Sequence, residues 1–180
     1  MSNSTEMGEN VKDKLKRCGR EVKIYPLAKI VKPEVIEIGD YCMIDDFTFV
    51  YGGKGIRIGR YVHIASFVSI VGGGELVVGD YADIACGSRI LTGTDTYLGG
   101  KRMSTALPQE QRNVTVGRVV IEKDAFVGTN VVIHPNVRIG EGAIIGSNSL
   151  VLKNVEAWSI NVGSPCKKIG DRPRVVVPDI

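Results

Sequence analysis

Aromatic residues are scarce in this sequence, and so are the residues that usually build metal or redox sites. Only 6% of the 180 residues are Phe, Trp or Tyr, and there are two histidines. None of the four cysteines, Cys18, Cys42, Cys86 and Cys166, forms a CxxC pair. The sequence therefore contains no zinc or thiol redox motif, and we expect an aliphatic core and no bound metal.

Long apolar runs and a strong net charge are absent as well. No apolar run reaches transmembrane length, and residues 1–17 are polar, without the apolar stretch of a signal peptide. The net charge of +3 does not indicate a nucleic-acid partner. We expect a cytoplasmic protein with free thiols, no membrane insertion and no nucleic-acid binding.

The main feature that is present is a repeat of six residues. Aliphatic side chains recur at this spacing, with two steps of eight and one long interruption. The fifteen positions are Ile38, Ile44, Val50, Ile58, Ile64, Ile70, Val78, Ile84, Ile90, Ile121, Val127, Ile133, Ile139, Ile145 and Val151. Amphipathic helices need apolar residues three and four apart, so a period of six indicates a repeated strand and turn.

Such units bury their apolar side only by stacking into a solenoid. Three units per coil make a triangular prism in which the aliphatic residue points inward and a small residue four positions later fits the inner corner. Glycine often follows the aliphatic residue, as at Gly39 and Gly59, and we expect it to supply backbone conformations closed to other residues. The sequence predicts an all-β parallel β-helix with a protruding loop and short irregular termini.

The repeat also divides the chain. We expect an N-terminal tail and lead-in over residues 1–34 and the β-helix over 35–155. A polar insertion at about 92–118 interrupts the helix at one corner. A long irregular segment in a compact domain is often functional. Residues 156–180 depart from the repeat and form a separate C-terminal segment.

Residues at the same position of the repeat in successive coils stack into columns, in which neighbouring residues lie about 4.8 Å apart. His63 precedes Ile64 as Asp83 precedes Ile84, so these two side chains are predicted to point outward in one column. A carboxylate beside a histidine can orient the ring and favour its role as a general base. Two solvated surface residues that happen to stack are the alternative.

Two further candidates lie near the insertion. His134 follows Ile133 on an outward phase, and it would line the same cleft from a neighbouring subunit or simply pack there. Asp95 opens the insertion in TGTDTY, where an acidic residue often caps a turn. Cys86 and Cys166 lack a sequence-adjacent base, which disfavours a cysteine nucleophile.

The sequence resembles the hexapeptide-repeat acyltransferases over about residues 35–172. VVIEKDAFVGTNVVIHPNVRIGEGAIIGSNSLVLKNV is similar to the final coils of that family, and INVGSPCKKIGDR to its closing segment. The resemblance implies a left-handed helix and acetyl-CoA as acyl donor. In the galactoside and maltose acetyltransferase branch of that family, the segment that corresponds to the insertion begins with a catalytic histidine. The matching stretch here is ILTGTDTY, in which Asp95 looks like the residue at that position. YVHIASFVSIVGGGELVVGDYADI, which contains His63, looks closer to the N-acetyltransferases of nucleotide-linked amino sugars used for surface polysaccharides such as lipopolysaccharide.

The same resemblance implies a coenzyme A slot between two prisms of a homotrimer. The matching positions are Phe126, Thr129, Ser147, Leu152, Lys153, Ser164 and Lys167, and Lys168 would join Lys153 and Lys167 at the coenzyme phosphates. The implied activity is direct acetyl transfer to a sugar amine or hydroxyl with His63 as base and a backbone N–H at the oxyanion.

Other functions stay open on the same fold. One is O-acetylation of a galactoside, a maltose-like sugar or an antibiotic. Another is a γ-type carbonic anhydrase, which needs three histidines on zinc where this chain has two in all. A third is a non-catalytic assembly subunit. Fold alone does not choose among acceptors.

Overall fold

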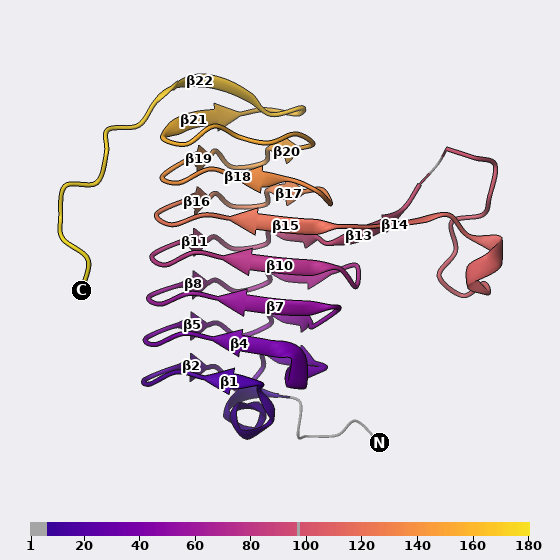
Figure 1. Ribbon diagram of the computed structural model, residues 1–180, viewed down its shortest axis with the longest axis horizontal. Helices are drawn as coiled ribbons and strands as arrows, with labels where there is room; N and C mark the ends of the chain where they lie inside the picture. Colours follow the sequence, from indigo (N-terminus) through magenta and orange to yellow (C-terminus); the bar gives the residue numbers. More distant parts are fainter. Residues whose placement is uncertain (1–6, 97) are drawn as a thin grey trace.

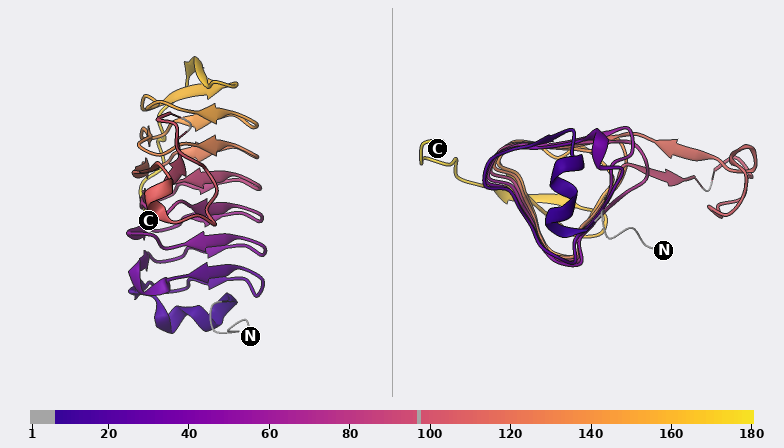
Figure 2. Two further views of the ribbon diagram at one scale, coloured as in Figure 1. Left: turned by 90° about the vertical axis from the view of Figure 1, so that its right-hand side faces the viewer. Right: turned by 90° about the horizontal axis from the view of Figure 1, so that it is seen from below.

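Three sheets of stacked strands form a prism, as the six-residue period predicts (Figure 1), and its cross-section is triangular (Figure 2). The computed structural model describes residues 7–96 and 98–180. We call the sheets faces 1, 2 and 3 in chain order. Each coil contributes a short strand to each face, with in-register pairing between coils. The all-β solenoid is confirmed and is consistent with a left-handed β-helix.

The strands of each face are as follows. Face 1 contains β1 (Arg17–Cys18), β4 (Ile36–Ile38), β7 (Gly55–Ile58), β10 (Glu75–Val78), β15 (Arg118–Ile121) and β18 (Arg138–Ile139). Face 2 contains β2 (Lys23–Ile24), β5 (Met43–Ile44), β8 (His63–Ile64), β11 (Asp83–Ile84), β16 (Phe126–Val127), β19 (Ile144–Ile145), β21 (Ser159–Val162) and the antiparallel β22 (Lys167–Asp171). Face 3 contains β3 (Lys29–Val31), β6 (Phe49–Tyr51), β9 (Ser69–Val71), β12 (Arg89–Leu91), β17 (Val132–Ile133) and β20 (Leu150–Val151).

The core consists of the inward aliphatic residues. All fifteen positions of the repeat are buried, each with 5% or less of its surface exposed. The small residues of the inner corner are buried too, and the hydroxyl of Thr48 donates to the carbonyl of Ala65 at 3.1 Å. This hydrogen bond satisfies a polar group inside an apolar column.

The glycines that follow the aliphatic residue have a different role from the expected one. Gly39 and Gly59 do not adopt a positive φ. A β carbon at Gly39 would lie 2.5 Å from the carbonyl oxygen of Gly59 in the next coil. These glycines therefore allow coils to approach each other. The left-handed corner conformations fall two residues later, at Tyr41 and Tyr61, with φ of 59° and 55°.

The prism is longer than the expected range of 35–155. Its first coil is formed by β1, β2 and β3, which lie within the segment expected to be a lead-in. Beneath them the 3-10 helix η2 (Gly8–Lys14) lies across the open end of the prism and buries Val11 (Figure 2). At the other end β21 pairs with β19, so the stack continues past Val155. The first coil keeps the spacing of the others, because Ile24 and Ile30 lie six residues apart and Ile30 lies eight before Ile38, so the repeat extends below the expected boundary at residue 35.

Every departure from the six-residue step falls at the corner between faces 3 and 1. The 3-10 helix η3 (Pro33–Val35) and the turns at 52–54 and 72–74 lie there. The insertion leaves from the same corner as an arm, a hairpin of β13 (Gly93–Asp95) and β14 (Val114–Val116) followed outward by η4 (Gln109–Gln111) (Figure 1). Within the described residues no helix is long and apolar enough to cross a membrane.

Candidate active site

His63 lies on the outer surface of face 2, between two other coils. β8 pairs with β5 below it and with β11 above it, which sets His63 in register with Met43 and Asp83. The Nδ1 atom of His63 lies 3.4 Å from Oδ2 of Asp83. The structure thus brings together the two residues that the column argument paired.

The nearer carboxylate is one that the sequence analysis missed. Oδ2 of Asp45 lies 3.1 Å from Nε2 of His63. Asp45 follows the buried Ile44, and its neighbour in the next coil is Ala65. The small side chain of Ala65 leaves room for Asp45 to reach diagonally to His63. Asp45 and His63 occupy different positions of the repeat, so comparing residues at the same position could not reveal this contact. An acidic residue directly after an inward aliphatic one could still have marked Asp45 as a candidate.

The Asp45–His63–Asp83 cluster has a definite hydrogen-bonding capacity. A neutral imidazole donates through one nitrogen and accepts through the other, whereas the protonated ring donates through both. Two flanking carboxylates therefore give the added proton a second acceptor. The side chains of Asp45, His63 and Asp83 are 27%, 33% and 44% exposed, so a ligand on face 2 can reach them.

Several of the residues assigned to coenzyme A lie higher on the same face. Phe126 is paired with Asp83, which places it two rungs above His63, about 10 Å along the prism. In the adjacent column Ala65 is followed upward by Ala85, Gly128 and Gly146, none of which extends past a β carbon. Thr129 and Ser147 stack at the neighbouring corner, between faces 2 and 3.

The other predicted coenzyme residues lie at the upper end of the prism. Leu152, Lys153, Lys167 and Lys168 line a pocket of about 450 Å³, whereas Ser164 does not line it. Lys168 is paired with Glu156 at 3.0 Å and with Asp171 at 2.9 Å, and these carboxylates raise its pKa. Lys153 and Lys167 form no ion pair with any residue that the structure describes.

Asp95 lies at the root of the arm, where Arg112 holds it. Nε and Nη2 of Arg112 donate to the two carboxylate oxygens at 3.0 and 2.6 Å, and the side chains are only 10% and 16% exposed for Asp95 and Arg112. The carboxylate raises the pKa of the guanidinium. Asp95 is therefore part of strand β13 and does not cap a turn. His134 lies one rung above Leu91, close to the point where the arm leaves.

One chain does not bring the candidate residues into a single site. His63 belongs to face 2, whereas the arm leaves from the corner between faces 3 and 1, opposite that face. The view along the prism shows the arm leaving at one corner (Figure 2). Leu152 and Lys153 follow β20 at that same far corner. His63 can meet Asp95 or His134 only if a second chain contributes one of them.

Neither of the two cysteines considered for a covalent route has a histidine or carboxylate contact among the residues that the structure describes. Cys166 is packed against the core, and burial raises its pKa. Cys86 is exposed at the corner between faces 2 and 3, in the same column as Thr129. All four cysteines are free.

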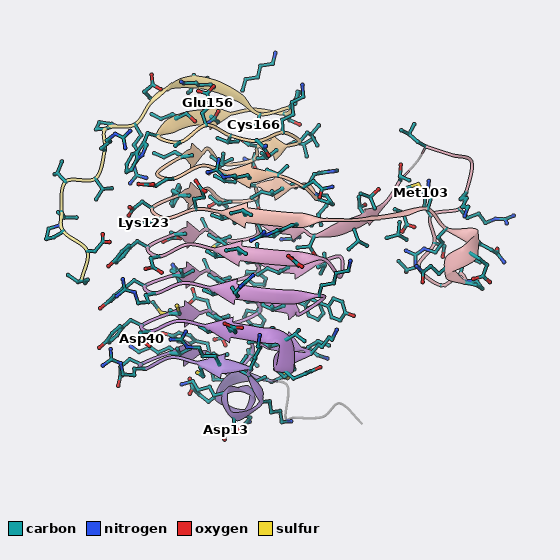
Figure 3. All side chains as sticks on the ribbon, in the orientation of Figure 1. Asp13, Asp40, Met103, Lys123, Glu156 and Cys166 are labelled. Carbon is teal, nitrogen blue, oxygen red and sulfur yellow. The ribbon has the colours of Figure 1, made fainter. Side chains whose placement is uncertain are left out.

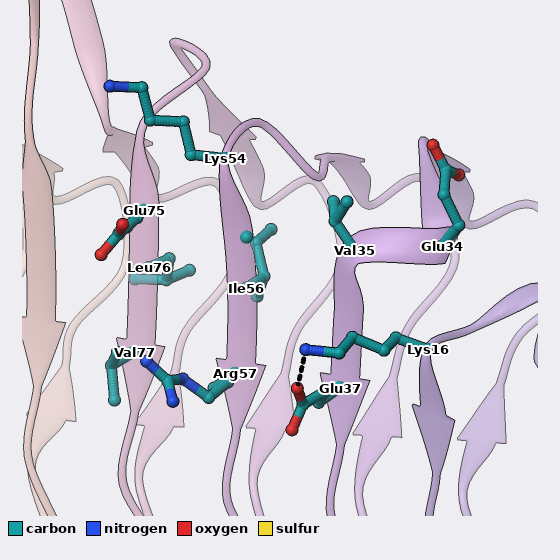
Figure 4. A pocket seen from close by; sticks show the side chains of 11 residues that line it. Lys16, Glu34, Val35, Glu37, Lys54, Ile56, Arg57, Glu75, Leu76 and Val77 are labelled. Atoms are coloured by element: carbon teal, nitrogen blue, oxygen red, sulfur yellow. Dashed lines mark ion pairs between the residues drawn. The ribbon is translucent and has the colours of Figure 1, made fainter.

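A second pocket, of about 390 Å³, lies on face 1 against β4, β7 and β10 (Figure 4). Its wall is charged, and Lys16 pairs with Glu37 at 2.7 Å while Arg57 extends beside Val77. Figure 3 shows how densely outward side chains cover the prism. The face 1 pocket is on a different side from His63, and we assign it no role.

Comparison with known proteins shows which family these features belong to. Residues 118–153 match the family model "Bacterial transferase hexapeptide (six repeats)". The chain is 37% identical over 160 residues to dTDP-4-amino-4,6-dideoxy-D-glucose acyltransferase of Escherichia coli, covering 88% of this chain and 83% of the relative. The chain belongs to the hexapeptide-repeat acyltransferases.

Solved structures agree with this assignment. AntD, an N-acyltransferase from Bacillus cereus, in complex with dTDP and 3-hydroxybutyryl-CoA, superposes with a TM-score of 0.87 at 35% identity, over 92% of this chain and 88% of AntD. An AntD variant in complex with dTDP-4-amino-4,6-dideoxyglucose and coenzyme A gives the same TM-score at 34% identity, over 92% and 89% of the two chains. Chloramphenicol acetyltransferase of Klebsiella aerogenes is 44% identical over only 69 residues, which are 38% of this chain and 31% of that relative.

Proposed function

We propose that this acyltransferase transfers an acetyl group from acetyl-CoA to the amine of a nucleotide-linked amino sugar. The observation that carries the proposal is a likeness over nearly the whole chain, in sequence and in structure, to acyltransferases of dTDP-linked amino sugars. A likeness of this extent includes the lower coils and the arm as well as the upper coils matched by the family model.

The donor would lie along face 2 with its thioester pointing down toward His63. The column of small residues from Gly146 to Ala65 gives an extended pantetheine arm room beside Phe126. Lys153 and Lys167 at the upper end would meet the phosphates by charge. The distance from Phe126 to His63, about 10 Å, suits a donor that runs parallel to the prism axis.

In the proposed reaction the sugar amine attacks the thioester carbonyl carbon. A C–N bond forms, the C–S bond breaks, and coenzyme A leaves as a thiolate. His63 removes one proton from the amine nitrogen, with Asp45 and Asp83 holding the ring, and that proton then returns to the sulfur. A backbone N–H donates to the oxyanion of the tetrahedral intermediate.

The sites would lie between the subunits of a homotrimer. The predicted coenzyme residues fall on face 2 and its corner with face 3, and on the corner from which the arm leaves. A slot between two prisms unites these two sets, and it would bring Asp95 and His134 of one subunit toward His63 of the next. A ring of three identical contacts closes this arrangement.

Location and pathway are part of the same proposal. Four free thiols are typical of a reducing compartment, so we place the protein in the cytoplasm. An N-acylated nucleotide sugar is a donor for glycosyl transfer, which is consistent with a role in making surface polysaccharide such as lipopolysaccharide.

The decisive experiment is a thiol-release assay with acetyl-CoA and a panel of acceptors. We expect turnover with dTDP-4-amino-4,6-dideoxyglucose and little with chloramphenicol or simple galactosides, which represent the O-acetyltransferase alternative. His63→Ala should lower turnover by about a hundredfold with an unchanged circular dichroism spectrum. Turnover only with hydroxyl acceptors would replace N-acylation by O-acetylation. If calorimetry detected no binding of coenzyme A, the non-catalytic assembly subunit would be the interpretation that remains.

A further inference from the structure

The corner between faces 2 and 3 carries two phenylalanines that the proposed reaction does not use. Phe47 and Phe67 occupy the same corner position in neighbouring coils, with ring centroids 5.0 Å apart and planes at 8°. Their residues are 53% and 58% exposed. Both have a φ of +63°, a conformation that costs energy for a bulky side chain.

The higher coils use the residues that this conformation favours. The positions stacked above Phe67 are Gly87, Asn130 and Asn148, all with positive φ. Glycine and asparagine adopt this region with little strain. Phe47 and Phe67 therefore depart from the glycine and asparagine that occupy the rungs above them, and their exposed rings are candidates for a role outside folding.

A comparable ladder at another corner has internal partners. Tyr41, Tyr61 and Tyr81 stack between faces 1 and 2, with Tyr61 covered by rings on both sides at 4.9 and 5.4 Å. Arg20 and Lys123 cover the two ends of that ladder. Phe67 has a ring below it only, because the next residue up is Gly87, where a β-carbon position is filled by the side-chain oxygen of Asn130.

A cation lies at the same corner, against the backbone of Phe67. Nη1 of Arg89 donates to the carbonyl of Phe67 at 3.0 Å and also to that of Gly87. This anchors the guanidinium at the corner while its other nitrogens stay free, and Arg89 pairs with no carboxylate in the described part of the chain. Asp46, the acid closest in sequence to Phe47, already accepts from the backbone N–H of Leu27 at 2.8 Å.

We propose that Phe67 and Arg89 form the subsite for the nucleoside diphosphate of the acceptor, with the base stacked on Phe67 and the diphosphate on Arg89. This inference rests on the proposed function. Phe67 lies four residues after His63 on the same coil, at most about 13 Å away. Ribose, diphosphate and hexose span that gap and carry the amine to His63. Phe47 supports the ring from below.

The subsite is tested by calorimetric titration of dTDP into the full chain. Phe67→Leu keeps an apolar side chain but removes the stacking surface, and it should weaken dTDP binding roughly tenfold or more. Arg89→Gln should weaken it by a similar factor and reduce its dependence on salt. The matched control is Tyr61→Leu, which removes a stacked ring from the other corner and should leave dTDP affinity within about twofold of wild type.

Kinetics separate this subsite from the chemistry. Phe67→Leu should raise KM for the dTDP-linked amino sugar with little change in kcat, and acetylation of the free amino sugar should not change. If both variants bound dTDP as tightly as the wild type does, the subsite would be overturned. The proposed function would still stand if the wild-type enzyme acetylated the dTDP-linked sugar. Loss of dTDP binding only together with a changed sedimentation coefficient would make Phe67 a subunit contact and overturn it as well. A wild-type chain that binds no nucleoside diphosphate and acetylates no nucleotide-linked amino sugar would refute the proposed function itself.

Discussion

A site shared between subunits makes a prediction about mixtures of two inactive variants. His63→Ala removes the proposed base from face 2, and Asp95→Asn alters the acid at the root of the arm, on the opposite corner. Asn keeps an oxygen that can accept from Arg112, so the arm should stay in place. Each variant alone should lose about a hundredfold in turnover if its residue acts in the proton transfer.

Random mixing sets the size of the recovery. Suppose that each site uses His63 of one chain and Asp95 of its neighbour. A site is then intact only where an Asp95→Asn chain, which retains His63, supplies His63 and a His63→Ala chain, which retains Asp95, supplies Asp95. In trimers assembled from equal amounts of the two variants, half of the chains satisfy each condition, so about one quarter of the sites are intact. The mixture should therefore regain about 25% of wild-type activity, well above the roughly 1% of either variant.

The assay is thiol release from acetyl-CoA after the two variants are denatured, mixed and refolded together. The same treatment of each variant alone is the control for reactivation, and light scattering checks that trimers form. A mixture no more active than the mean of its components would refute the shared site. So would full activity of Asp95→Asn alone, because Asp95 would then have no part in the reaction.

Four further predictions concern the cluster, the core, the coil contact and a thiol. Asp45→Asn should lower kcat/KM by about tenfold, and Asp83→Asn by less, because Asp45 lies nearer to His63 and is less exposed. Ile64→Asp should cost more than about 4 kcal/mol of unfolding free energy in urea, since it buries an unpaired charge. Gly39→Ala should cost about 1–3 kcal/mol, because its β carbon meets backbone. Cys42, whose pKa burial raises to about 11, should not react with a disulfide reagent at pH 8, and its contribution to stability should decline as pH rises from 9 to 11.

Matched variants separate these causes from general damage. Asp46→Asn, beside Asp45, should leave kcat/KM nearly unchanged. Gly170→Ala introduces a β carbon with nothing within 4 Å and should be neutral, in contrast to Gly39→Ala. Cys86 is exposed and should react in the native protein at pH 8, whereas rapid labelling of Cys42 there would contradict its burial.

The prism was predictable because its information is local and repeated. Each coil presents the same requirement, an inward aliphatic residue such as Ile64 or Ile84, and the fifteen repetitions leave little freedom in period or phase. The role of Gly39 was not predictable in the same way. Its constraint comes from the carbonyl of Gly59, twenty residues away, and not from its own φ.

The candidate site was predictable only in part, for a related reason. Equal phase paired His63 with Asp83, but the diagonal contact of Asp45 depends on the small size of Ala65. The Arg112 partner of Asp95 lies across a hairpin whose register no repeat specifies. Contacts that follow the periodicity can be read from the sequence, whereas contacts across a corner or within the arm need the structure.

The distribution of corner residues suggests how one prism serves two substrates. Thr129 and Ser147 lie at the corner between faces 2 and 3 in the upper coils. Phe47 and Phe67 lie at the same corner in the lower coils, and His63 is on the same coil as Phe67. A donor entering from above and an acceptor held from below would then meet at one rung. Because each coil contacts only its neighbours, substitutions in the lower coils can change the acceptor without disturbing the donor path. The family model matches residues 118–153, which form part of the upper coils along which the donor would lie.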